Sequence, residues 1–192
     1  SRLAGQGAEV VTMSPAEEPG RPTQVTLETV YAFEPVPAVL DATQAKHILG
    51  VQANVWTEHM RSFKRVQHAV CPRIAAVAES GWSPREGKDY ADFLQRLPAM
   101  LPRWNALGIT PAHTPFQPLI DANADAGGKV RVEMAQPLGY AIRYTTDGSA
   151  PNASSTLYAG PVSLPMPVDV QAQAFAGAQA LAPVVRREFS AA

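Results

Sequence analysis

Trp56 and Glu58 are the residues of this 192-residue chain whose types and spacing most directly indicate binding chemistry. They follow a short apolar stretch, and side chains two residues apart along a strand point to the same face. An indole ring offers a flat apolar surface, and a carboxylate offers hydrogen-bond acceptors. A sugar ring, with apolar C–H faces and a rim of hydroxyl groups, is complementary to both. The alternative is a buried tryptophan beside an ion-paired glutamate, and the spacing alone does not separate the two.

The elements that must position this pair follow a strand–helix pattern. Residues 48–55 are apolar and are expected to form a strand that ends at Trp56, and residues 9–13 are expected to form an earlier, buried strand. Helical sequence follows each strand, as in the βα units of a parallel sheet. Because two parallel strands cannot bury both of their faces alone, the pattern predicts one edge of a larger α/β structure.

Downstream of the pair, apolar residues recur at helical spacing. A helix is expected from Arg61, and Pro72 should end it and begin the next helix. Arg73 and Glu79 are the two charges of this otherwise apolar second helix. We expect both to stabilise the structure rather than to take part in chemistry.

Further helices are predicted before and after these two. Short helices are expected over residues 26–32 and 41–46, with Thr26 and Asp41 as their N-caps. The strongest amphipathic pattern covers residues 89–107. Because prolines lie inside it, we expect a kink or break near residues 96–99.

The periodicity changes after a stretch rich in proline and glycine. Residues 111–128 have the composition of a linker, and from residue 129 apolar residues alternate with a period of two. Asp147-Gly148 is a hairpin signal. We therefore predict two domains, residues 1–110 and residues 129–192, of which the second is an all-β sandwich.

Composition argues against several classes of protein. The 16 Lys and Arg residues balance 17 Asp and Glu residues, which argues against nucleic-acid binding through a basic surface. No apolar run is long enough to span a membrane. The single cysteine, Cys71, rules out an internal disulfide and is expected to be a buried thiol. No metal site and no cofactor are expected, because His47, His59, His68 and His113 show no metal-ligand spacing.

The motifs around Trp56 resemble glycoside hydrolase family 20, the beta-N-acetylhexosaminidases and chitobiases. The resemblance covers about residues 10–109 and implies the C-terminal portion of a (β/α)8 TIM barrel, including its strands seven and eight. Residues 142–161 resemble the immunoglobulin-like C-terminal domain of bacterial chitobiases and hexosaminidases. The residues that carry the first resemblance are Val30-Tyr31-Ala32-Phe33-Glu34-Pro35-Val36-Pro37, Leu49-Gly50-Val51-Gln52-Ala53, Trp56-Thr57-Glu58, Pro72-Arg73, Ala76, Ala78-Glu79 and Trp82.

The resemblance implies an exo-acting hydrolase that removes terminal N-acetylglucosamine or N-acetylgalactosamine from chitin-type or peptidoglycan-type oligosaccharides. In this family the acetamido oxygen of the substrate attacks with overall retention, an Asp orients the acetamide, and the adjacent Glu is the general acid. Trp56 is implied to stack on the terminal sugar, and Glu58 to accept hydrogen bonds from its outer hydroxyls. A bacterial protein in the periplasm or outside the cell is also implied.

The catalytic Asp-Glu pair is missing, because no Asp-Glu dipeptide occurs in the sequence. We therefore expect no catalytic residue in this chain and no activity from it alone. The N-terminal part of the barrel would be its partner and would supply the pair. Without that partner, residues 1–110 are expected to expose apolar surface.

A second departure from the family lies after the strand predicted over residues 9–13. Relatives carry a Tyr-x-Asp there, whereas this chain runs from Pro15 directly into Ala16. Either the pocket loop is deleted or the chain has a discontinuity at that bond. The alternative function, from another class, is a non-catalytic carbohydrate-binding or structural module. An Asp-Glu pair upstream of Ser1 would favour the enzyme.

Overall fold

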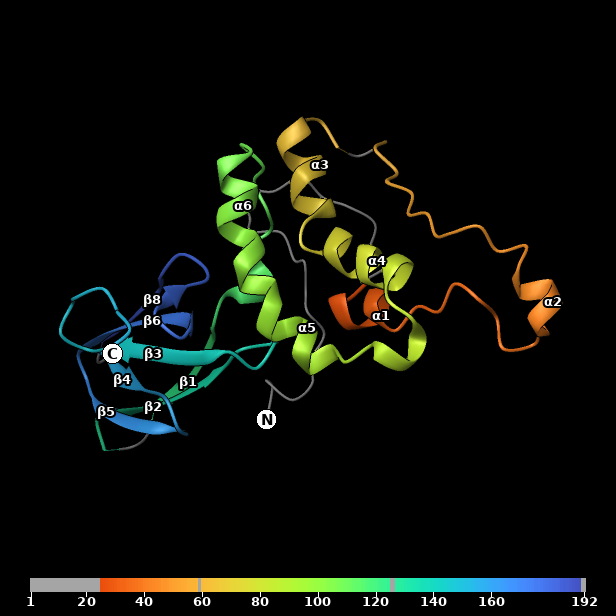
Figure 1. The fold of residues 1–192 in the computed structure, drawn as a ribbon. Coiled ribbons are helices and arrows are strands. Elements are labelled where there is room, and N and C mark those ends of the chain that lie inside the picture. Colours follow the sequence, from red (N-terminus) through yellow and green to blue (C-terminus); the bar gives the residue numbers. More distant parts are fainter. Residues whose placement is uncertain (1–24, 59, 125–126, 191–192) are drawn as a thin grey trace. The chain divides into compact units, whose positions relative to one another are not determined.

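A computed structural model of the protein describes residues 25–58, 60–124 and 127–190, and Figure 1 shows its fold. Contacts divide these residues into two compact units, a helical unit up to Ala112 and a β unit from His113, and each is described by itself. The strand predicted over residues 9–13 and the junction between Pro15 and Ala16 lie outside the described residues.

The helical unit begins with two short capped helices. Helix α1 spans Leu27–Tyr31, and the backbone N–H of Thr29 donates to the Thr26 hydroxyl at 3.0 Å. Helix α2 spans Ala42–Ala45 and begins with a capping box between Asp41 and Gln44. Both predicted N-caps are confirmed. Each satisfies backbone N–H groups that have no partner inside the helix.

The remaining helices follow the irregular stretch after α2. They are α3 (Phe63–Val70), α4 (Arg73–Trp82), η1 (Arg85–Gly87), α5 (Tyr90–Arg96), η2 (Leu97–Ala99) and α6 (Met100–Ala106). The break predicted near residues 96–99 is confirmed, because the 3₁₀ turn η2 separates α5 from α6 at Pro98. Proline has no N–H for the helical ladder, which explains the local change of helix type.

A packed core joins these helices. Leu27, Phe93 and Leu97 are almost fully buried, and Leu101 and Trp104 are buried with them. Cys71 is also buried, as predicted, and burial raises the pKa of its thiol. The apolar faces predicted for α5 and α6 thus do form the interior of this unit.

The strand predicted over residues 48–55 is wrong for this structure. Residues 48–57 have no regular secondary structure, and the described residues between α2 and α3 form no helix or strand, as the orange trace in Figure 1 shows. Leu49 is 96% exposed. A strand is defined by hydrogen bonds to a neighbour, and no described residue of this unit supplies them. All strand ladders among the described residues are antiparallel, so the parallel sheet is not seen there.

The β unit contains two antiparallel sheets preceded by the 3₁₀ turn η3 (Thr114–Phe116). In the first sheet the strand order is β1-β2-β5. In the second sheet β4, β3, β6 and β7 follow one another, and β8 also pairs with β6. The strands are β1 (Leu119–Ala124), β2 (Lys129–Ala135), β3 (Ala141–Thr145), β4 (Thr156–Leu157), β5 (Val162–Pro165), β6 (Val168–Ala176), β7 (Gln179–Ala180) and β8 (Val185–Phe189).

Alternate side chains of both sheets share one core. Val130 and Val132 of β2 are buried together with Ile142 of β3 and Val170 of β6. This pattern confirms the predicted period of two. One boundary differs: β1 lies inside the predicted linker, because its pairing with β2 was not visible in its polar, proline-flanked sequence.

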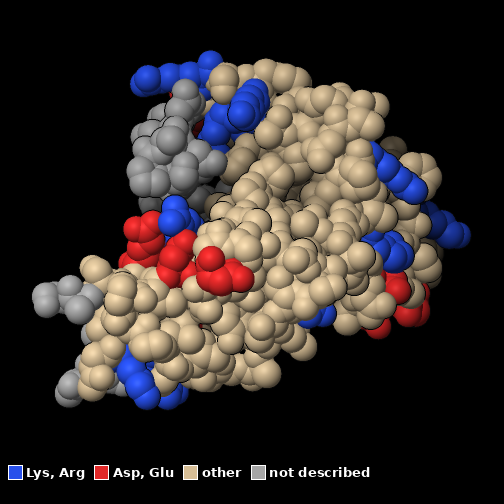
Figure 2. All heavy atoms as spheres, turned by 90° about the vertical axis from the view of Figure 1, so that its left-hand side faces the viewer, with Lys and Arg blue, Asp and Glu red and all other residues tan. Residues whose placement is uncertain are grey.

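Charged side chains are dispersed on the face of the molecule drawn in Figure 2. Among the described residues drawn there, Lys and Arg side chains form several small groups, and Asp and Glu side chains form others. None of these groups is by itself an extended basic patch of the kind that nucleic-acid-binding proteins use.

Candidate functional site

The predicted sugar-binding residues lie on the irregular segment between α2 and α3. We call residues 48–58 the pocket segment. The Trp56 side chain is 74% exposed, and Glu58 is exposed as well. Trp56 is therefore not a core residue of the described helical unit. Its indole surface is available to a ligand or to another part of the protein.

Contacts at its two ends and in its middle hold the pocket segment. At its start the Ile48 N–H donates to the Ala45 carbonyl at 3.0 Å, and near its end the Met60 N–H donates to the Thr57 carbonyl at 2.9 Å. Helix α3 then begins at the Ser62 cap. In the middle, the side chain of Val51 lies against Gly81 of α4, where an added Cβ would be only 2.8 Å from Val51 Cγ1.

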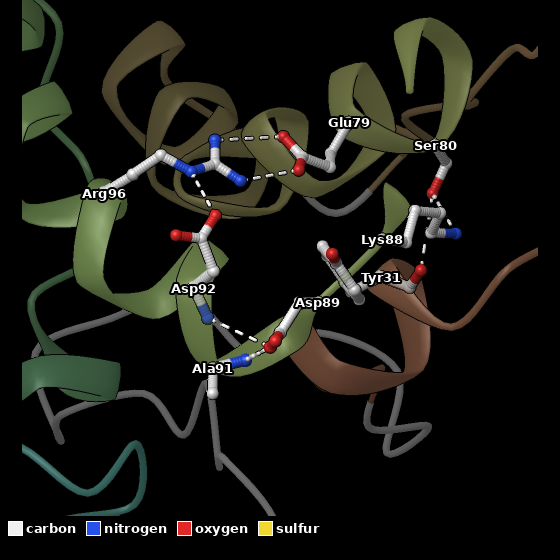
Figure 3. Close-up of polar contacts among 8 residues, drawn as sticks. All are labelled: Tyr31, Glu79, Ser80, Lys88, Asp89, Ala91, Asp92 and Arg96. Atoms are coloured by element: carbon white, nitrogen blue, oxygen red, sulfur yellow. Dashed lines mark hydrogen bonds and ion pairs between the residues drawn. The ribbon is translucent and has the colours of Figure 1, made fainter. Parts of the chain in front are cut away.

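A second polar group, centred on Arg96, joins α4 to α5 (Figure 3). The Arg96 guanidinium donates to both carboxylate oxygens of Glu79, at 2.6 and 3.2 Å, and to Asp92 at 2.7 Å. Hydrogen bonds to Glu79 and then to Asp92 raise the pKa of Arg96. The structural role predicted for Glu79 is confirmed. Fork-shaped pairing of this kind fixes the orientation of both partners.

Arg73 is also structural, as predicted. Its Nε donates to the Val25 carbonyl at 2.7 Å, and its Nη1 donates to the Ala69 carbonyl at 3.1 Å. Arg73 thus ties the start of α4 to the end of α3 and to the chain that enters α1. Arg73 and Glu79, the two charged residues of α4, both lie outside the pocket segment.

Sequence reasoning missed Lys88, which links three parts of the helical unit (Figure 3). Its ammonium group donates to the Ser80 hydroxyl at 3.3 Å, as Figure 3 shows. It also donates to the Phe33 carbonyl at 3.0 Å. It also lies 5.2 Å from the centre of the Tyr31 ring, and burial raises the pKa of that phenol. No signal in the Gly-Lys-Asp sequence indicates this role, because all its partners are distant in sequence.

Neutralising Glu79 is expected to lower stability modestly. Glu79→Gln keeps the shape of the side chain but removes the charge opposite Arg96, whose side chain is 51% exposed. Because solvent screens this pair, we expect a loss of about 1 kcal/mol in the free energy of unfolding. The measurement is denaturant unfolding of the full chain.

Asp92→Asn is the matched control for that substitution. Asp92 makes a single contact with Arg96 from one turn away and is 58% exposed. Such pairs contribute about 0.3–0.5 kcal/mol. If Glu79→Gln and Asp92→Asn lost the same free energy of unfolding, the fork-shaped pairing of Glu79 with Arg96 would have no special role in stability.

The described residues contain neither a metal-binding cluster nor a membrane-spanning helix. Within residues 25–58, 60–124 and 127–190, no three His, Cys, Asp or Glu side chains come together in a way that could hold a metal ion. In the same part of the chain, no helix has the length and apolar character needed to cross a bilayer.

Two sequence families match the chain. Residues 9–85, which include the pocket segment, match the catalytic domain of glycosyl hydrolase family 20. Residues 123–185 match the chitobiase/beta-hexosaminidase C-terminal domain.

Individual relatives match over parts of the chain. A protein of Porphyromonas gingivalis named beta-hexosaminidase is 34% identical over 139 residues, which are 71% of this chain and 18% of that protein. A beta-N-acetylhexosaminidase of Cellulomonas fimi is 31% identical over 85 residues, 44% of this chain and 17% of the relative. A beta-hexosaminidase of Akkermansia muciniphila is 33% identical over 72 residues, 38% of this chain and 14% of the relative. The chain thus spans less than a fifth of the length of these curated relatives. The chain is thus similar in one stretch to the catalytic domain of glycosyl hydrolase family 20 and in a later stretch to the C-terminal domain of chitobiases and beta-hexosaminidases.

Proposed function

We propose that this chain is the C-terminal part of an exo-acting beta-N-acetylhexosaminidase. In this proposal the helical unit belongs to the end of a (β/α)8 barrel and forms one wall of the sugar pocket. The β unit is the immunoglobulin-like domain that follows the barrel. We call the natural protein that contains these residues the parent protein, and its periplasmic or secreted location is part of the proposal.

The observation that carries the proposal is the apolar surface of the helical unit. Large apolar side chains are exposed on the pocket segment and on both helices that follow it. Soluble proteins seldom leave so many uncovered, and such surfaces mark sites of contact with other protein. The most exposed in this unit are Leu49 at 96%, Trp82 at 91%, Val39 at 85%, Phe63 at 75%, and Trp56 and Leu107 at 74% each.

The match to a catalytic domain suggests what covers this surface. The matched residues 9–85 are far fewer than the roughly 250 residues of a (β/α)8 barrel, so in this proposal the remaining strands and helices would lie against the exposed side chains. Pairing with a neighbouring parallel strand would also supply inter-strand hydrogen bonds, which residues 48–57 do not form with any described residue. The N-terminal part of the barrel is therefore the proposed partner.

Within the assembled pocket, the chain would bind the sugar rather than break the bond. The indole of Trp56 would stack on the apolar face of a terminal N-acetylglucosamine or N-acetylgalactosamine, and the Glu58 carboxylate would accept hydrogen bonds from its hydroxyls. The reaction would be retaining and substrate-assisted. Because no Asp-Glu dipeptide occurs in the chain, the general acid and the acetamide-orienting Asp would come from the partner.

The alternative function is a non-catalytic carbohydrate-binding or structural module. Within described residues 113–190, no Trp, Tyr or Phe side chain is exposed. A flat aromatic platform for sugar binding is therefore not found in that part of the β unit, which favours a structural role for it.

The test compares the parent protein with the 192-residue chain on a chromogenic N-acetyl-beta-glucosaminide and on the galactosaminide. We expect the parent protein to hydrolyse at least one of them and the chain alone to hydrolyse neither. If the chain alone hydrolysed either substrate, the proposal that its partner supplies the catalytic residues would be refuted. If the parent protein were inactive but still bound chitin oligosaccharides, the alternative function of a non-catalytic carbohydrate-binding module would be established instead.

A further inference from the structure

We propose that Gly81 of helix α4 is a positioning residue of the sugar pocket. It sets how closely the pocket segment approaches the helix and thereby fixes where Trp56 and Glu58 lie. The inference rests on the proposed function of those two residues.

The spacing between Gly81 and Val51 leaves no room for a side chain on the helix. A Cβ added to Gly81 would lie 2.8 Å from Val51 Cγ1. Carbon atoms in contact are normally about 3.5–4.0 Å apart. Every residue type other than glycine would therefore push the pocket segment away from α4.

The backbone conformation of Gly81 does not itself require glycine. The described glycines with positive φ are Gly108, Gly128, Gly139, Gly148 and Gly177, and Gly81 is not among them. Glycine is also less favourable than alanine inside a helix. The contact with Val51 therefore gives a physical reason for a glycine at this position.

Helix α4 is anchored on other sides, so a clash would move the pocket segment rather than the helix. Glu79 pairs with Arg96 of α5, and the buried Ser80 hydroxyl donates to the Tyr31 carbonyl at 3.4 Å. Residues 48–57, by contrast, have no regular secondary structure. Because α4 is tied to α1 and α5, a Cβ added at Gly81 would displace Val51 and the residues that follow it.

Displacement at Val51 would be transmitted along a short piece of chain. Val51 is β-branched, so its Cγ atoms are fixed close to the backbone and cannot swing far away. Trp56 follows five residues later and Glu58 seven residues later, before α3 begins at the Ser62 cap. A shift at Val51 therefore changes the placement of both sugar-binding side chains.

The test is a double-substitution cycle in the parent protein with Gly81→Ala, Val51→Ala and the two combined. Gly81→Ala alone is expected to lower kcat/KM on the chromogenic N-acetylhexosaminide roughly 10- to 100-fold, mainly through KM. In the Val51→Ala background, where the clashing methyl groups are gone, Gly81→Ala is expected to change kcat/KM less than about threefold.

The control is Gly87→Ala in η1, where an added Cβ would be 3.6 Å from Pro84 Cγ, an ordinary contact. It should leave KM unchanged. Hydrogen exchange of residues 48–58 separates the possible failures. Faster exchange is expected in Gly81→Ala and recovery in the double variant.

Each outcome bears on a different claim. Unchanged exchange and KM in Gly81→Ala would overturn the positioning role, as would a loss that Val51→Ala does not relieve. An inactive wild-type parent protein would instead overturn the proposed function. A lower melting temperature with unchanged KM would make Gly81 a purely structural residue and would also refute the inference.

Discussion

Replacing Glu58 with glutamine in the parent protein is expected to weaken binding of the terminal sugar by about 1.5–3 kcal/mol. This corresponds to roughly a 10- to 150-fold higher Kd. The physical reason is the loss of the charge that strengthens hydrogen bonds from the sugar hydroxyls. Glu58 is exposed in the described helical unit, so the melting temperature should not change. Calorimetric binding of N-acetylglucosamine and thermal unfolding measure the two effects.

The control is Glu86→Gln, the same substitution at an exposed glutamate of η1. It should change neither affinity nor stability. Glu58→Gln could instead lower the stability while the protein that remains folded binds the sugar with normal affinity. That result would make Glu58 a structural ion-pair partner. Trp56→Ala should weaken binding independently, because it removes the stacking surface.

Replacing Phe116 with alanine is expected to lower the free energy of unfolding by about 3–5 kcal/mol. Phe116 is fully buried in the β unit, and its ring centre lies 6.0 Å from that of Tyr140, whose phenol pKa is raised by burial. Beside it, the Gln136 side chain donates to the Pro115 carbonyl at 2.8 Å and accepts from the Tyr140 N–H at 3.0 Å. Removing the Phe116 ring would leave a cavity. Because these hydrogen bonds hold the surrounding chain in place, the cavity cannot easily collapse.

Denaturant unfolding of the full chain measures this loss, with Leu157→Ala as the control. Leu157 is 52% exposed, so its truncation should cost less than about 1 kcal/mol. If Phe116→Ala were as mild as Leu157→Ala, the packing described around η3 would be wrong.

Local features of the fold were predictable from the sequence. The N-caps Thr26 and Asp41 were recognised because a cap depends on residues within one helical turn. The break between α5 and α6 followed from Pro98, since a missing N–H acts where it occurs. The alternation in β2 likewise reflects a buried face that each strand shows by itself.

Features that depend on distant residues were not predictable. The strand expected over residues 48–55 needs hydrogen bonds from a neighbour, and its sequence cannot show whether that neighbour is present. The contacts of Lys88 with Phe33, and of Val51 with Gly81, join residues from separate elements. For the candidate site, the sequence predicts Trp56 and Glu58 as sugar-binding residues, and this stays a prediction; it gives no sign of the contact between Val51 and Gly81.

The most direct test of the central claim is a crystal structure of the parent protein with N-acetylglucosamine bound. We predict that the indole of Trp56 lies flat against the sugar ring and that a Glu58 carboxylate oxygen accepts a hydroxyl hydrogen bond of about 2.5–3.0 Å. Adjacent Asp and Glu residues from the N-terminal part of the barrel should reach the acetamide and the anomeric oxygen. A sugar bound elsewhere, with Trp56 packed into the protein core, would contradict the account.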